Sequence, residues 1–272
     1  MTVNTDKSLH DRVVLITGGS RGIGKAMAVG LAAAGARLVI TASRKSPELD
    51  DAVAEIEQAS SPARALGIVA DVRNYADCEA AVDAAVERFG AVQALVNNAG
   101  VGMGIIKADY PLGAPSFWEA DPAQVARMLD TNVTGAFNMA MAIAPHLVGQ
   151  GFGKIVNIST STVTLTLKGF SPYGPSKAAL EAGSLIWSRD LADKGVDVNV
   201  LLPGGATDTS IIPPFPGREE RGGGIMPPTI MVPPISWLCS DQSNGVTGGR
   251  YIAKQWDASL PAGDAAARAR DN

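Results

Sequence analysis

The sequence has few of the residues that form disulfides or bind metal ions. Its two cysteines, Cys78 and Cys239, are too few for a disulfide framework, so we expect both thiols to be reduced, as in a cytoplasmic protein. Its two histidines, His10 and His146, lie far apart in the chain, and no group of thiols accompanies either of them. The sequence therefore predicts no metal site.

Long apolar runs and an excess of basic residues are also missing. No stretch approaches the roughly 18 apolar residues that a membrane span requires. The formal net charge is −4 and there is no basic stripe, which argues against nucleic acid as a partner. Residues 1–11 form a polar N-terminal tail that lacks the apolar core of a signal peptide. We therefore expect a cytoplasmic protein with a small-molecule substrate and no contact with membranes.

What the chain does contain is ample material for a core, with 46% hydrophobic residues and 30 glycines. Apolar strand patterns alternate with helical patterns over residues 12–256, which predicts an α/β fold, a single-domain Rossmann-type doubly wound sheet. The predicted strands cover residues 12–16, 37–41, 65–69, 94–96, 154–158, 196–202 and 250–253. The predicted helices cover residues 25–34, 47–59, 75–89, 122–130, 133–147, 173–193 and 235–238. Residues 257–272 are a C-terminal tail, either a short helix or a frayed end.

A glycine-rich turn lies between the first predicted strand and the first predicted helix. It reads Thr17-Gly18-Gly19-Ser20-Arg21-Gly22-Ile23-Gly24, a G-x-x-x-G-x-G spacing. Glycines let the backbone approach a pyrophosphate, and the start of a helix offers free N–H groups and a partial positive charge. We therefore expect a dinucleotide site here, formed by Gly18, Ser20, Arg21, Gly22, Ile23 and Gly24.

Two long connections do not fit the alternation of strands and helices. Residues 101–120 carry several large apolar side chains and form either a loop folded over its own residues or the wall of a substrate pocket. Residues 203–234 contain eight prolines, which leave no room for a regular element of ordinary length. We interpret residues 204–234 as a substrate flap rather than a disordered linker, because they lie between two core elements.

Tyr173 and Lys177 are the pair that points to chemistry. At i and i+4 they project from one face of the predicted helix. An ammonium about 4 Å from the phenol contributes about 4 kcal/mol at an effective dielectric constant near 20. This lowers the tyrosine pKa by up to about three units before the opposing cost of desolvation. A tyrosine with a pKa near 7 is a workable general acid–base. Taken alone, such a pair is more often an ordinary contact on a helix surface.

The pair does not stand alone, because the motifs together resemble the short-chain dehydrogenase/reductase family in order and spacing. The chain has Thr-Gly-x-x-x-Gly-x-Gly, then Asn97-Asn98-Ala99-Gly100, an asparagine before a helix, Tyr-x-x-x-Lys and a Pro-Gly turn. The resemblance covers residues 10–255. It implies one sheet of seven mainly parallel strands, and hydride transfer between NAD(P) and an alcohol or carbonyl.

The resemblance also implies roles for three residues of the catalytic set. Tyr173 is expected to donate the proton to the carbonyl oxygen. Lys177 is expected to hold the ribose hydroxyls beside the nicotinamide and to lower the pKa of Tyr173. Asn132 corresponds to the asparagine that anchors a proton-relay water, although an asparagine at this place can also cap a helix.

The catalytic hydroxyl is ambiguous in this sequence. The family's serine usually lies thirteen positions before the tyrosine, and position 160 holds a threonine. A threonine hydroxyl can give the same hydrogen bond, or a loop one residue shorter would let Ser161 act instead. Ser159 is the weaker candidate because strand alternation points it away from the side of Thr160. We therefore keep both Thr160 and Ser161.

The remaining cofactor contacts follow from the resemblance alone. It places three residues after a strand, Asn98, Ala99 and Gly100, against the adenosine ribose. It places Asp71 and Val72 against the adenine, and Pro203 and Gly204 against the nicotinamide. Thr207 or Thr209 corresponds to the threonine that binds the carboxamide, but the turn is one residue longer than usual.

The end of the second strand indicates which dinucleotide binds. An NAD site has an acidic residue there for the ribose 2′-hydroxyl, and the nearest acid in this chain is Glu48. The chain instead has Ser43 and Arg44, with Arg21 in the glycine turn. Although these can be ordinary solvated arginines, together with the missing acid they favour NADP over NAD.

The leading interpretation is an NADP(H)-dependent carbonyl reductase or alcohol dehydrogenase with an uncharged, fairly apolar substrate. The alternatives are a polyol or sugar dehydrogenase of the same family and a non-catalytic NADP-binding sensor. The presence of Tyr173, Lys177 and Asn132 argues against the sensor. The resemblance and the two predicted helices at 122–130 and 133–147 predict a homotetramer or homodimer.

Overall fold

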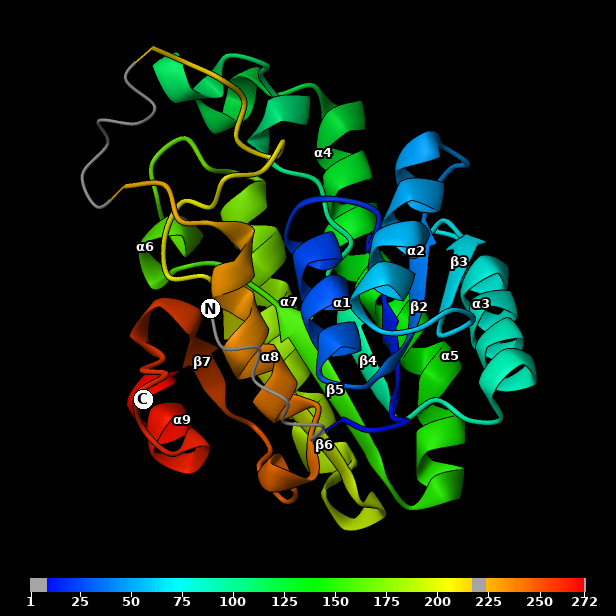
Figure 1. The fold of residues 1–272 in the computed structure, drawn as a ribbon. Coiled ribbons are helices and arrows are strands. Elements are labelled where there is room, and N and C mark those ends of the chain that lie inside the picture. The colour runs from blue at the N-terminus through cyan, green and yellow to red at the C-terminus, as the bar shows by residue number, and fades with distance from the viewer. Residues whose placement is uncertain (1–8, 217–223, 272) are drawn as a thin grey trace.

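The centre of the structure is an eight-stranded sheet in the order β3-β2-β1-β4-β5-β6-β7-β8 (Figure 1). The computed structural model describes residues 9–216 and 224–271. Strands β1 to β7 pair in parallel, and β8 runs antiparallel to β7. The strands are β1 (Val13–Ile16), β2 (Arg37–Ala42), β3 (Ala65–Val69), β4 (Ala94–Asn97), β5 (Gly153–Ile158), β6 (Val196–Leu202), β7 (Arg250–Ile252) and β8 (Arg270–Asp271). The predicted fold class is confirmed, with one short strand more than expected.

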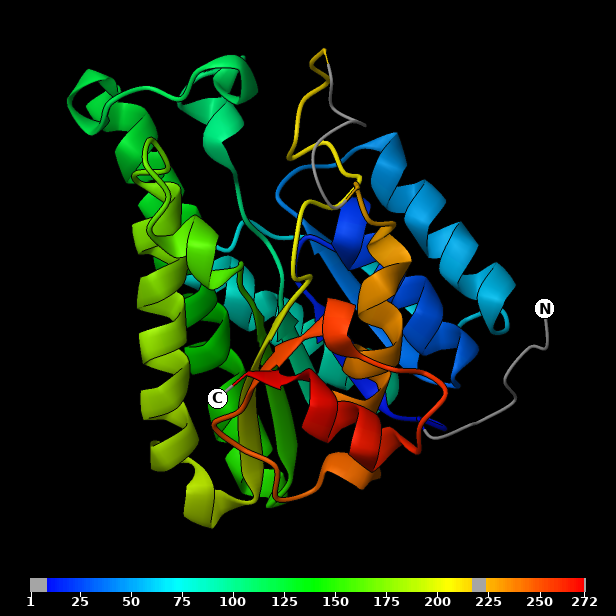
Figure 2. The same ribbon diagram turned by 90° about the vertical axis from the view of Figure 1, so that its left-hand side faces the viewer.

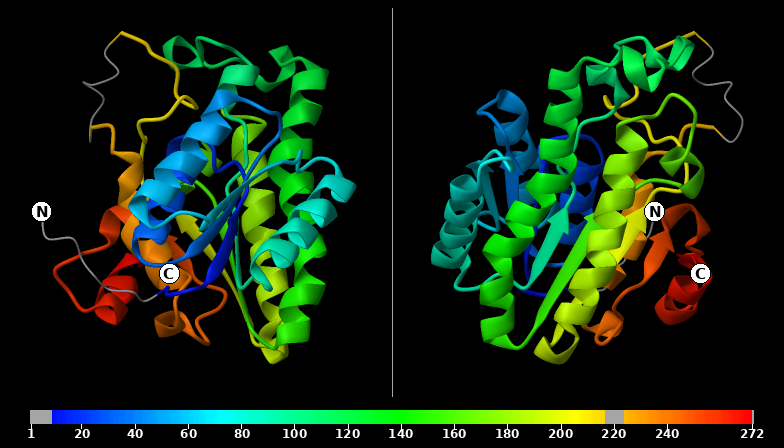
Figure 3. Two further views of the ribbon diagram at one scale, coloured as in Figure 1. Left: turned by 45° about the vertical axis from the view of Figure 1, so that its right-hand side comes forward. Right: turned by 180° about the vertical axis from the view of Figure 1, so that it is seen from behind.

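Helices cover both faces of this sheet (Figures 2 and 3). One layer holds α1 (Gly22–Ala33), α2 (Pro47–Ala59) and α8 (Val232–Leu238). The other holds α3 (Tyr75–Phe89), α5 (Gly135–Gln150) and α7 (Tyr173–Asp190). The shorter helices are α4 (Pro122–Leu129), α6 (Thr162–Leu165) and α9 (Ala262–Ala269). Among the described residues, no helix combines the length and apolar character that crossing a bilayer requires.

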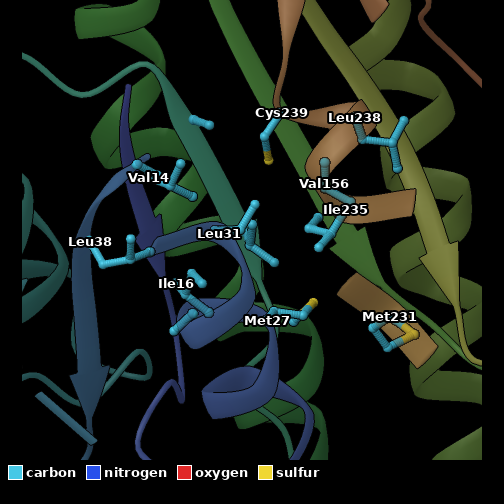
Figure 4. Close-up of a cluster of buried hydrophobic side chains, with 14 of the residues drawn as sticks. Val14, Ile16, Met27, Leu31, Leu38, Val156, Met231, Ile235, Leu238 and Cys239 are labelled. Carbon is cyan, nitrogen blue, oxygen red and sulfur yellow. The ribbon is translucent and has the colours of Figure 1, made fainter. Parts of the chain in front are cut away.

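Burial on both sides explains why β1 is a continuous apolar run. Val14 and Ile16 belong to the core under α1 and α8, where Met27, Leu31 and Ile235 pack (Figure 4). The alternate residues Val13 and Leu15 belong to the core under α3 and α5. Each fully buried side chain of this size contributes about 1.5–3 kcal/mol. The sheet is thereby fixed, and its carboxyl edge becomes a rigid base for the loops that follow each strand.

Two predicted helices form one continuous helix in the structure. Residues 122–130 and 133–147 were expected to be separate, but a π-helical turn at Asp130–Thr134 joins α4 to α5. Asn132 lies in this turn, so it does not cap a helix N-terminus. Single π turns inside α-helices are frequent at functional sites.

The segment after residue 257 forms a short helix, α9, rather than a frayed end. Ala265, Ala266 and Ala269 of α9 are buried against the core. The strand β8 that follows pairs with β7 through Arg250 and Tyr251. The segment is therefore part of the packed structure as far as Asp271.

The long connections take up the carboxyl edge of the sheet. Residues 101–120 contain 3₁₀ turns at Met103–Ile105, Tyr110–Leu112 and Phe117–Glu119. The predicted flap contains a bridge between Thr207 and Met226. It also contains residues 217–223, which lie outside the described residues, as do residues 1–8 of the predicted N-terminal tail.

Candidate active site

The backbone of the glycine turn packs so closely against its neighbours that side chains would not fit. Gly18 has φ +64°, and a Cβ there would lie 2.9 Å from Ala99 Cα. A Cβ on Gly24 would lie 2.3 Å from Gly18 O. Arg21, the residue that caps α1, makes no side-chain hydrogen bond to the first turn of that helix. The free N–H groups and the close backbone approach fit a dinucleotide pyrophosphate.

Asn98, which directly follows the neighbouring strand β4, stabilises this turn. Its side-chain amide donates to Thr17 O at 2.9 Å and to Gly18 O at 3.0 Å. In return, Thr17 Oγ1 accepts from the backbone N–H groups of Asn98 and Ala99, both at 3.0 Å. The amide hydrogens of Asn98 are thus committed to the protein, so its side chain shapes the turn.

Gly100 brings the same loop to the catalytic set. A Cβ there would lie 3.2 Å from Asn132 Oδ1 and 3.7 Å from Lys177 Nζ. A larger residue would therefore crowd both polar groups. The predicted cofactor loop and two of the predicted catalytic residues meet at this point.

The side-chain amide of Asn132 is buried and makes three hydrogen bonds. Its Oδ1 accepts from Val101 N at 2.8 Å, and its Nδ2 donates to Val101 O at 3.0 Å and to Ser176 Oγ at 3.1 Å. Both amide hydrogens are therefore used. The side chain joins the loop after β4 to α7, and only a remaining oxygen lone pair is left for a water.

The three hydroxyls considered for the catalytic set have different surroundings in the structure. The side chain of Thr160 lies near enough to Tyr173 to lower the pKa of the phenol. Ser161 instead caps α6, where its Oγ accepts from Thr164 N at 3.2 Å. Ser159 Oγ donates to Glu181 Oε1 at 2.5 Å and so faces away from Tyr173. Only Thr160 of the three presents its hydroxyl to the tyrosine.

The expected lowering of the Tyr173 pKa by Lys177 is not found. Burial raises the pKa of Tyr173 to about 12, and the hydrogen bond with Thr160 opposes this only in part. Burial also lowers the pKa of Lys177 to about 8, with the nearby charge of Glu181 opposing. The Lys177 Nζ donates to Ile158 O at 2.9 Å. The desolvation cost set against the expected lowering therefore dominates, and the ammonium is directed at a carbonyl.

At the end of β2, Ser43, Arg44 and Arg21 are all exposed. The pKa of the Glu48 carboxyl is lowered chiefly by a hydrogen bond with Ser46 and further by the charges of Arg21 and Arg44. Both arginines therefore lie near the start of α2, although they come from different loops.

The other predicted cofactor residues also lie at the carboxyl edge. The Asp71 carboxylate accepts from Arg73 Nε at 3.0 Å, and this contact lowers the pKa of Asp71. Val72 is buried and its carbonyl accepts from Asn138 Nδ2 at 2.9 Å. The carbonyl of Pro203 accepts from Lys254 N at 3.0 Å.

The turn after β6 reaches across to the glycine turn. Gly204 has φ +91°, which favours glycine. Of the two threonines considered, Thr207 is buried beside Met226, whereas Thr209 lies over the glycine turn, with its Cγ2 3.3 Å from the Cβ position of Gly22. Ile211 Cγ1 lies 2.7 Å from the Cβ position of Gly102, so the flap touches the loop after β4.

Four residues near the site were given no individual role from the sequence. Tyr110 lies close enough that its charge raises the pKa of Tyr173, and its ring packs edge-on against Phe170 with centroids 5.8 Å apart. Ser176 lies inside the Tyr-x-x-x-Lys motif and Glu181 lies one turn after it, so helical spacing could have identified both. The fourth, Arg250, bonds to the carbonyl of Thr160 at 2.9 Å, and no local pattern marks it.

Comparisons with known proteins agree with this geometry. A family model described as short chain dehydrogenase matches residues 12–215. The chain is 31% identical over 197 residues to the 3-oxoacyl-[acyl-carrier-protein] reductase of Synechocystis sp., covering 72% of this chain and 75% of that protein. It is 32% identical over 246 residues to the 2,5-dichloro-2,5-cyclohexadiene-1,4-diol dehydrogenase LinX of Sphingobium indicum, covering 88% and 93%.

Solved structures agree as well. The crystal structure of 3-ketoacyl-(acyl-carrier-protein) reductase from Brucella melitensis complexed with NADH is 28% identical and matches with a TM-score of 0.78. That match covers 89% of this chain and 96% of the Brucella chain.

The buried Lys177 should leave a signature in the pH dependence of stability. Its pKa of about 8 lies below the ordinary value of 10.5, so between these pH values the unfolded chain binds the extra proton. The free energy of unfolding should therefore rise with pH in this window, by at most about 3 kcal/mol. We expect denaturant titrations to show this rise for the wild type relative to Lys177→Met. An exposed control, Lys194→Met, should track the wild type, and a flat difference for Lys177→Met would contradict the assignment.

Proposed function

Since the chain belongs to the short-chain dehydrogenase/reductase family, whose members are oxidoreductases acting on alcohol and ketone groups, we propose that it transfers a hydride between NADP(H) and a ketone or secondary alcohol. The observation that carries the proposal is that Lys177, one helical turn after Tyr173 on α7, lies beside Gly100, in the loop whose Asn98 is bonded to the glycine turn. When bound, the nicotinamide supplies or accepts the hydride. The residues of the chain handle the proton and hold the reacting groups.

In the reducing direction, Tyr173 is the proton donor. With a pKa of about 12, its phenol stays protonated at neutral pH and is ready to donate to a carbonyl oxygen. Thr160 holds the phenol in place through its hydrogen bond and provides a second hydroxyl for the same oxygen. In the oxidising direction Tyr173 must lose its proton, and stabilisation of the phenolate then falls to Thr160 and to protonated Lys177.

Lys177 has the second role in this scheme. Its pKa of about 8 lets the amine exchange protons near neutral pH. Its bond to Ile158 O and its position beside Gly100 orient it toward the loop where the ribose of the cofactor is expected. Asn132 holds that loop in place through Val101. The four residues thus divide proton transfer, orientation and support among them.

The preference for NADP rests on charge at the end of β2. The exposed Arg21 and Arg44 both act on Glu48, and Ser43 lies beside Arg44. No acidic residue follows β2 before Glu48 to take a ribose 2′-hydroxyl. A 2′-phosphate carrying about two negative charges would complement both guanidinium groups.

An apolar carbonyl compound is the substrate class that the surrounding loops favour. Phe117 and Trp118 are 70% and 73% exposed, with their rings packed edge-on at 5.2 Å. On the segment before α7, Val163 and Leu167 are also exposed. A sugar or polyol would find few hydrogen-bonding partners among these side chains. A panel of ketones and alcohols followed by NADPH absorbance would identify the substrate.

Removing the hydroxyl of Tyr173 or of Thr160 should lower kcat while leaving cofactor binding intact. Tyr173→Phe keeps the ring and loses only the proton donor, so kcat should fall by at least about a hundredfold. Thr160→Val should lower kcat by about tenfold or more for loss of its hydrogen bond. Steady-state kinetics, with NADPH fluorescence titration for binding, measure both effects.

Ser161→Ala is the matched control for these variants. Because Ser161 caps α6, its loss should cost about 1 kcal/mol of stability and change kcat by less than about threefold. If Ser161→Ala lowers kcat more than Thr160→Val does, the assignment of the hydroxyl is incorrect. If Tyr173→Phe retains a tenth of the wild-type kcat, the mechanism itself fails.

Arg44→Asp should move the cofactor preference toward NADH. The new carboxylate would repel a 2′-phosphate and could accept a bond from a ribose 2′-hydroxyl. Since a hydrogen bond to a charged group contributes about 1.5–3 kcal/mol, kcat/KM for NADPH should fall by about ten- to a hundredfold. Measuring kcat/KM with both cofactors tests this, with Lys45→Asp as a neighbouring control. A wild type that prefers NADH would contradict the proposal and show that Arg21 and Arg44 are ordinary surface charges.

Assembly into a homodimer or homotetramer is part of the same proposal. Met141 and Val148 on α5, and Leu185 and Ile186 on α7, are exposed apolar side chains on one layer of helices. Light scattering at micromolar concentration should therefore give two or four times the chain mass of 28.0 kDa. A monomer at that concentration would contradict this part of the proposal.

A further inference from the structure

Arg250 lies at the start of β7 and contacts three separate parts of the chain. Its Nε donates to Glu181 Oε2 at 3.1 Å, and its Nη2 donates to the carbonyl of Thr160 at 2.9 Å. Its Nη1 is paired with the Asp271 carboxylate of β8. The side chain is only 18% exposed. A guanidinium with this many directed bonds has little freedom to move.

Glu181 also contacts Ser159, the residue before Thr160. Its second carboxylate oxygen accepts from Ser159 Oγ at 2.5 Å. Glu181 thus holds the side chain of Ser159 while Arg250 holds the backbone of Thr160. The ion pair of Glu181 and Arg250 thus holds two consecutive residues that directly follow β5.

These contacts bear on the direction in which Thr160 points. With Ser159 held toward Glu181 and its own carbonyl held by Arg250, Thr160 is left with its side chain near Tyr173. The bond to the Thr160 carbonyl fixes the remaining freedom of that peptide. Glu181 also faces Lys177, one turn earlier on α7, so the same ion pair adjoins both polar partners of the tyrosine.

We propose that Arg250 is a positioning residue, which together with Glu181 and Asp271 fixes Thr160 in hydrogen-bonding geometry with Tyr173. The inference rests on the proposed function for its kinetic consequence, but not for its structural one. Asp271 completes the arrangement by holding the third edge of the guanidinium. Strand β8 thereby contributes to the active site although it touches none of the reacting groups.

The effect of Arg250 on the surroundings of Tyr173 can be measured by NMR without any catalytic turnover. The chain has four tyrosines, so ¹³C labelling at tyrosine Cζ gives four NMR signals, and Tyr173→Phe identifies the one that matters. Thr160→Val supplies the reference shift for loss of the hydroxyl bond. We expect Arg250→Met to move the Tyr173 signal in the same direction as Thr160→Val.

The kinetic consequence should separate kcat from binding. Arg250→Met should lower kcat by about tenfold or more, because a displacement of about 1 Å can cost a hundredfold in rate. NADPH affinity from fluorescence titration should stay within about twofold of the wild type, since the glycine turn is untouched. Arg250→Lys, which keeps one charged donor, should recover part of both kcat and the NMR shift.

Arg268→Met is the matched control, because it removes another arginine of the same region, one paired with Asp257 and remote from Thr160. It should leave the Tyr173 signal and kcat unchanged. Should Arg250→Met fail to fold, Arg250→Lys and Asp271→Asn decide by the same signal. A Tyr173 signal that stays at its wild-type position in these variants overturns the proposal. A wild type without turnover would overturn the proposed function alone, because the NMR comparison still decides the role of Arg250.

Discussion

The buried amide of Asn132 is the contact on which the geometry of the site depends. It satisfies both backbone groups of Val101 and the hydroxyl of Ser176, and so joins the loop after β4, the π turn and α7. Each buried polar group left without its partner costs about 1–3 kcal/mol, so the three segments favour one arrangement strongly. The sheet supplies a rigid base, and this amide sets the distance between the cofactor loop and the helix that carries Tyr173 and Lys177.

Burial that holds these residues in place also changes their protonation. It raises the pKa of Tyr173 to about 12 and lowers that of Lys177 to about 8, so the neutral form of each is favoured. A neutral phenol suits a proton donor in reduction, whereas oxidation must overcome the cost of forming a buried phenolate. The hydrogen bond with Thr160 opposes that cost directly. Under the proposed function, the hydroxyl at position 160 would tune the tyrosine as well as hold a substrate.

Elements that depend on local signals could be predicted from the sequence. The helix at Tyr75–Phe89 begins where the Asn74 side chain accepts from Ala76 N and ends at Gly90, which has φ +85°, so capping alone determines its bounds. The placement of Tyr173 and Lys177 one helical turn apart could also be predicted from their spacing in the sequence. The different surroundings of Thr160 and Ser161 could not, because they depend on how the segment after β5 packs against α6 and α7. The continuous helix through Asn132 and the packing of α9 and β8 likewise depend on tertiary contacts such as the pairing of Arg250 with Asp271.

The most direct test of the account is to follow the hydride itself. NADPH carrying deuterium at the transferred position is incubated with the enzyme and apolar ketones, and the alcohol is analysed by mass spectrometry. The account predicts one deuterium on the carbinol carbon of the product, formed by the wild type and lost in Tyr173→Phe. Binding of labelled NADPH or NADH without transfer to any carbonyl compound, or transfer that persists undiminished in Tyr173→Phe, would contradict it.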